Sequence, residues 1–128
     1  MFNQKFAPLS LAVAALALLH GPASAAAPSF GNFGQIEFRS DPAALVGAVR
    51  TDLAAQIPSG SSVADARAVL GEAGARCRPA QADGSVRCRY YGTHFQNDGV
   101  EPVSWTVNLS TQGDKVQSFT VVRQPAVN

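Results

Sequence analysis

The sequence predicts an α+β fold in which two N-terminal helices pack on one face of a three- to four-stranded antiparallel sheet. Apolar residues recur at helical spacing over 41–74 and alternate with polar residues after Gly74. Two cysteines flank an Asp-Gly turn signal where the spacing changes, which indicates an antiparallel hairpin. A chain of 128 residues suits a single domain.

Residues 1–25 have the organisation of a secretory signal peptide. Lys5 supplies the positive charge, residues 9–19 form an apolar run, and Ala23-Ser24-Ala25 is an A-x-A cleavage site. Because a bilayer span needs about 20 residues, an uncleaved anchor or a buried core helix is the weaker interpretation. We expect cleavage near Ala25 and a periplasmic or secreted protein without a transmembrane span in its mature form.

Residues 26–40 contain several Pro, Ser and Gly residues and predict a flexible N-terminal segment. Within this segment, residues 35–39 alternate in part, which predicts a short strand or an extended arm. Phe30 and Phe33 are unusual in such a segment. We expect both rings to dock on the protein's own core, and a partner-binding arm is the alternative.

Two helices are predicted between residues 41 and 74. The first begins at Asp41, an N-cap residue, followed by Pro42 in the first turn. The second begins at Ser62, with Asp65 at the position of a capping box, and glycines end it. Their apolar stripes, which we expect to face the sheet, consist of Leu45, Val46, Val49 and Leu53, then Val63, Ala66, Val69 and Leu70.

Strands are predicted at 86–91 and 103–109, and the clean alternation of the second predicts one buried face. A last strand follows at 115–123, and residues 124–128 form a C-terminal tail. Two registers fit the last strand: Phe119 aligned with Val121, or Val116 aligned with Val122.

Cys77 and Cys88 are the only cysteines, and an even count in an exported domain predicts a disulfide. A four-residue loop over 81–84 would place Ala80 opposite Ser85 and the two cysteines opposite each other. A two-residue Asp-Gly loop would instead pair Cys77 with Tyr90. A redox or metal role is the weaker alternative, because the spacing is not C-x-x-C and four good zinc ligands are lacking.

Four arginines flank these cysteines and are predicted to project from the opposite face of the hairpin, beside Tyr91. Arginine and tyrosine are enriched in interfaces, and arginine binds carboxylate and phosphate through paired hydrogen bonds. We expect this face to bind an acidic partner surface or an anionic envelope component. The alternative is a solvated face that pairs with the nine acidic residues of the chain. The predicted partner-binding residues are Arg76, Arg78, Arg87, Arg89 and Tyr91.

The helical stretch that starts after Pro58 is similar to the Gly-Ser/Thr-x-x-Asp/Glu-x-x-x-x-Leu-Gly motif of SmpA/OmlA (BamE-like) envelope proteins. The matching residues are Gly60, Ser61, Asp65, Leu70 and Gly71, with small shifts in spacing. The resemblance covers residues 41–123. It implies helices followed by a three-strand meander, as in the related repeats of the β-lactamase-inhibitor fold. It also implies a function in protein–protein binding, typically at the outer membrane.

No catalytic residues, metal site or cofactor are predicted. A formal charge of +1 disfavours nucleic-acid binding, which needs a basic face. His94 lies with Asp98 and Glu101 in a segment, 92–102, that is predicted as a polar loop. We expect a solvated loop histidine, and a small hydrolase that uses His94 and these acids is the weakest alternative.

These observations favour an exported, non-enzymatic module that binds another envelope protein with an acidic surface. Its predicted context is outer-membrane or cell-envelope maintenance. The alternative is a periplasmic protein that binds a small molecule or a cell-wall fragment, with aromatic surface from Tyr90, Tyr91 and Trp105.

Overall fold

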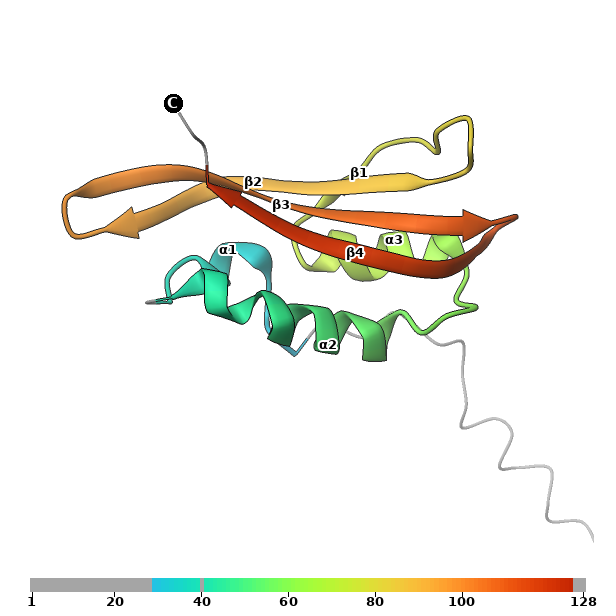
Figure 1. The fold of residues 1–128 in the computed structure, drawn as a ribbon, viewed down its shortest axis with the longest axis horizontal. Coiled ribbons are helices and arrows are strands. Elements are labelled where there is room, and N and C mark those ends of the chain that lie inside the picture. The colour runs from blue at the N-terminus through green and yellow to red at the C-terminus, as the bar shows by residue number, and fades with distance from the viewer. Residues whose placement is uncertain (1–28, 40, 126–128) are drawn as a thin grey trace, which may run out of the picture.

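A computed structural model describes residues 29–39 and 41–125 (Figure 1). The predicted signal peptide, 1–25, lies outside the described residues. The α+β class is confirmed, because an antiparallel four-stranded sheet combines with short helices. Within 29–39 and 41–125, no helix has the length and apolar character needed to cross a membrane.

The sheet has the strand order β1-β2-β3-β4, and each neighbouring pair is antiparallel. β1 (Arg76–Cys77) has two residues, whereas β2 (Val86–Gln96) has eleven. β3 (Gly99–Gln112) has fourteen residues and β4 (Lys115–Pro125) has eleven. The sheet is therefore a three-strand meander with a short stub on one edge.

The prediction of a polar loop over 92–102 is wrong, because these residues form the paired ends of β2 and β3, joined by a turn at Asn97 and Asp98. Of the two registers left open for the last strand, the alignment of Phe119 with Val121 holds, because Val121 is buried and Phe119 packs against the core, whereas Val116 and Val122 do not share a face. A bulge between Ser110 and Thr111 shifts the register, so Val116 and Val121 are both buried while Val122 is exposed. An extra residue on one strand reverses the alternation beyond it, which the local pattern of β4 cannot reveal.

The helical part begins with α1 (Phe33–Ile36), a helical turn where the sequence predicted a strand or an extended arm. The side chain of Asn32 caps this turn by accepting a hydrogen bond from the Gln35 N–H. The expectation that the two phenylalanines dock on the core is confirmed. Phe33 is buried, and Phe30 packs against the core.

Three further helical elements follow: the 3-10 turn η2 (Pro42–Leu45), α2 (Val46–Gln56) and α3 (Val63–Glu72). The Asp41 side chain makes no capping hydrogen bond, whereas Ser62 Oγ accepts one from the Asp65 N–H. The helical part of the described chain is thus four short elements, not simply the expected pair.

The helices of the described chain lie on one side of the sheet, and none of them covers the other face, which we call the uncovered face (Figure 1). The side chains between the two layers form one buried core. Its largest members are Trp105, Phe33, Ile36, Leu53, Leu70 and Leu109. The uncovered face carries the residues that alternate with these core positions along the strands.

Candidate functional site

Four arginines meet on the uncovered face where β1 pairs with β2. Arg76 stands opposite Arg89, and the Arg78 N–H donates to the Arg87 carbonyl at 2.9 Å. Cys88, between the two β2 arginines, is fully buried on the helix side. Strand alternation therefore directs Arg87 and Arg89 to the uncovered face, as predicted.

These arginines line a pocket of about 390 Å³, which we call the arginine pocket. Tyr91, which is 67% exposed to solvent, also lines it. The structure thus brings together all five residues that the sequence assigned to partner binding. The lining residues are Gly74, Arg76, Cys77, Arg78, Arg87, Arg89, Tyr90 and Tyr91.

The positive charge of the arginine pocket is not neutralised by any acidic side chain. All nine acidic residues lie within the described parts of the chain. Among residues 29–39 and 41–125, Glu37 forms an ion pair with Arg123 and lies 3.3 Å from His94 Nδ1, and no acidic side chain pairs with a pocket arginine. The alternative of intramolecular ion pairs is therefore wrong for these four arginines.

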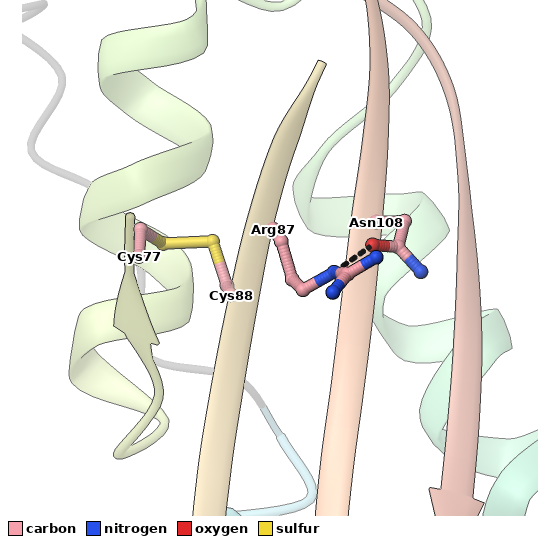
Figure 2. The surroundings of a disulfide bond; sticks show 4 residues. All are labelled: Cys77, Arg87, Cys88 and Asn108. Carbon is pink, nitrogen blue, oxygen red and sulfur yellow. Dashed lines mark hydrogen bonds between the residues drawn. A yellow bond between two sulfur atoms is a disulfide. The ribbon is translucent and has the colours of Figure 1, made fainter. Parts of the chain in front are cut away.

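Neutral groups hold the two β2 arginines in place. Arg87 Nε donates to Asn108 Oδ1 on β3 at 3.2 Å (Figure 2). Arg89 Nη1 donates to the Tyr91 hydroxyl at 2.8 Å, and its guanidinium carbon lies 5.9 Å from the centre of that ring. Arg89 Nε is buried and has no hydrogen-bond partner in the described part of the chain. An anion here would add the charge-assisted bonds that these guanidinium groups lack.

The predicted disulfide is present and joins Cys77 on β1 to Cys88 on β2 (Figure 2). The two cysteines stand opposite each other, so the predicted register is confirmed. The loop closes one residue inside the expected Ala80–Ser85 pair, because the Gln81 N–H donates to the Ser85 carbonyl. Asp83 Oδ1 accepts from the Ser85 N–H and hydroxyl, and these bonds lower the pKa of the Asp83 carboxyl.

A second polar cluster lies on the helix side of the sheet, around the buried Glu37. The Trp105 indole N–H donates to the Glu37 carboxylate, and Arg123 donates to both of its oxygens, at 3.0 and 2.8 Å. His94 Nδ1 lies 2.9 Å from the Glu37 carbonyl oxygen and 3.3 Å from Oε1. We call these four residues the Glu37 cluster. No sequence pattern predicted this cluster.

Burial raises the pKa of Glu37, but the hydrogen bonds from Arg123 and Trp105 and the charges of Arg123 and His94 lower it. The lowering effects prevail, so the carboxylate is charged at neutral pH. The bonds to Glu37 also raise the pKa of Arg123, against the effect of burial. The Glu37 cluster is thus a charged, fully bonded anchor between α1 and the sheet.

The expectation of a solvated loop histidine is wrong. His94 lies in β2 with a side chain that is 14% exposed, and it bonds to Glu37 instead of Asp98. Glu101 accepts a hydrogen bond from Gln96. No group of three or more His, Cys, Asp or Glu residues that could hold a metal ion is present in the described parts of the chain.

Comparison with known proteins gave no match, whether to protein-family models, to curated proteins or to solved structures.

Proposed function

We propose that the chain is an exported, non-enzymatic interaction module that binds an acidic surface of another envelope protein. The observation that carries the proposal is the arginine pocket, where four guanidinium groups have no carboxylate partner within residues 29–39 and 41–125. Uncompensated charge on a fixed strand pair favours an anionic partner, because each guanidinium can bind a carboxylate with two hydrogen bonds. None of the helices in the described part of the chain lies on the face that carries the pocket (Figure 1).

We also propose that the chain is related to BamE-like proteins and acts in outer-membrane or cell-envelope maintenance. In this interpretation α2 and α3 are the two N-terminal helices that pack on one face of the sheet. Support comes from the motif at Gly60, Ser61 and Asp65, and from helices that precede a meander of three long strands.

The test is capture of partners from detergent-solubilised envelope, using the mature oxidised protein and two charge-reversed variants. Arg76→Glu combined with Arg78→Glu changes the exposed pocket arginine of β1 and the exposed one that directly follows this strand. Arg39→Glu combined with Arg50→Glu makes the same charge change at exposed positions outside the pocket. We expect the pocket variant to lose capture of an acidic protein by tenfold or more, on the order of one charged hydrogen bond per arginine. Equal capture by the two variants contradicts the proposal.

A second candidate is binding of a small anionic molecule or cell-wall fragment, and the volume and lining of the arginine pocket favour it. A ligand that binds only the folded state raises the melting temperature. A muropeptide that stabilises the wild type and the Arg39/Arg50 variant, but not the pocket variant, would support this candidate.

A further inference from the structure

The edge of β2 is open beyond the arginine pocket, on the side toward Gln96. β1 pairs only with Cys88 and Arg89, whereas β2 continues to Gln96. Gly74, with φ of +98°, turns the chain from α3 into β1, and the Ala75 N–H bonds back to the Leu70 carbonyl. In the described chain, β1 therefore does not extend alongside Tyr91 and Thr93, and the β2 edge at these two residues has no neighbouring strand.

Two observations give the direction of the β2 main chain along this open stretch. The Arg87 carbonyl accepts from the Arg78 N–H, so Arg87 directs its polar groups toward β1. Groups of alternate residues in a strand point to the same side, which extends this direction to Tyr91 and Thr93. Independently, Thr93 stands opposite Pro102, which has no N–H to donate, as suits a pair without mutual hydrogen bonds.

On that side, the main-chain groups of Tyr91 and Thr93 have no other partner among the residues that the structure describes. Within 29–39 and 41–125, no hydrogen bond from outside the sheet reaches their N–H or carbonyl groups. The open stretch ends near Phe95, because the ring of Phe38 stacks on the ring of Phe95 with centroids 5.3 Å apart. Its other end is the arginine pocket, to which Tyr91 belongs.

We propose that an extended acidic segment of the partner protein adds to this edge as a strand. The segment continues the line of β1 antiparallel to β2, and its main chain bonds to Tyr91 and Thr93. Its alternate side chains lie on the uncovered face, where carboxylates reach the guanidinium groups of the pocket. This inference rests on the proposed function and specifies the form of the partner.

The geometry of β1 predicts which amides of the added strand bind. Arg76 and Arg78 point to the uncovered face, and the Arg78 N–H points to β2. An antiparallel strand that continues β1 therefore presents to β2 the amides of the residues whose side chains meet the pocket. In the proposed acidic segment, aspartates occupy the positions whose side chains meet the pocket, so the aspartate amides donate to β2.

The test uses a short synthetic peptide that alternates Asp and Thr, and the same peptide N-methylated at its aspartates. Methylation keeps every charge but removes the donors to β2. We expect the methylated peptide to bind the mature oxidised protein about tenfold more weakly, on the scale of one or two lost hydrogen bonds. At ten times its Kd, the unmodified peptide should also slow amide exchange of Tyr91 and Thr93 about tenfold. The Gly92 amide, which points to β3, is the internal reference.

Each outcome bears on a different claim. Equal affinity of the two peptides, or binding without protection of Tyr91 and Thr93, overturns strand addition. If strand addition fails in this way but the unmodified peptide still binds the wild type and not the Arg76→Glu/Arg78→Glu variant, the acidic-partner function stands. If the unmodified peptide does not bind at all, strand addition and the acidic-partner function both fail.

Discussion

Glu37 is the residue on which the attachment of the N-terminal segment depends. Its carboxylate is buried, and its bonding partners lie on all three long strands: His94 on β2, Trp105 on β3 and Arg123 on β4. A buried ion pair contributes little net stability, but removal of one member leaves the other charge without compensation. Loss of the Glu37 charge is therefore costly even though the pair itself is not strongly stabilising.

Glu37→Gln should lower the free energy of unfolding by about 3 kcal/mol, because Arg123 keeps its charge in a site that is mostly buried. Urea denaturation at neutral pH measures the change, and Trp105, the single tryptophan, reports it by fluorescence. Glu72→Gln is the matched control, since Glu72 is exposed and a surface change costs about 0.5 kcal/mol or less. Equal stability of the two variants contradicts the anchoring role.

The pH dependence of stability should differ between the wild type and Glu37→Gln. The pKa of Glu37 is lower in the folded protein than its ordinary value of 4.5. Its contribution is therefore complete above pH 4.5 and is lost as the pH falls through the folded-state pKa. We expect the stability difference between the two proteins to shrink below pH 4.5. A difference that stays constant into strong acid contradicts this assignment.

The sequence could not reveal the Glu37 cluster. His94, Trp105 and Arg123 lie 57, 68 and 86 positions from Glu37, so no local spacing signals their contact. Glu37 itself lies between two hydrophobic residues in a segment without a clear period. The arginine pocket could be predicted, because a short loop and a cysteine pair fix the register of neighbouring strands.

At the scale of elements, β1 is the weakest part of the sheet, and the pocket arginines Arg76 and Arg78 lie on it and directly after it. It has two residues, and the disulfide ties it to β2. Cross-linking restricts the unfolded chain, and closure of a loop this short stabilises the fold by about 2–3 kcal/mol. The disulfide also keeps Arg76 and Arg78 beside the β2 arginines.

Cys77→Ala combined with Cys88→Ala should therefore lower both stability and affinity. We expect a loss of about 2–3 kcal/mol in unfolding free energy and weaker binding of the acidic peptide by the fully folded variant. Thermal unfolding and a peptide titration in native buffer measure the two effects. The pocket variant, with its disulfide intact, separates loss of charge from loss of position. Undiminished affinity in the folded double-alanine variant would show that β1 needs no covalent tie.

At the scale of the whole molecule, the two polar sites lie on opposite faces of the sheet. The helix side contains the core and the Glu37 cluster, and the uncovered side carries the arginine pocket (Figure 1). No residue belongs to both polar sites. The α+β class was predictable because periodicity reports which face is buried. The bulge in β3–β4 and the helical turn α1 were not, because each depends on contacts distant in the chain.

This separation predicts that substitutions in the two sites combine additively. Glu37→Gln should lower stability and leave peptide affinity unchanged, while Arg76→Glu/Arg78→Glu should lower affinity and leave stability within about 0.5 kcal/mol. Sites without shared partners usually add within about 0.5 kcal/mol, so the triple variant should show the sum of both effects. Urea denaturation and peptide titration of all four proteins measure it. Coupling above 1 kcal/mol, beyond that usual deviation, would mean that the sheet transmits changes between its faces, and the arginine pocket could then not be treated as a preformed site.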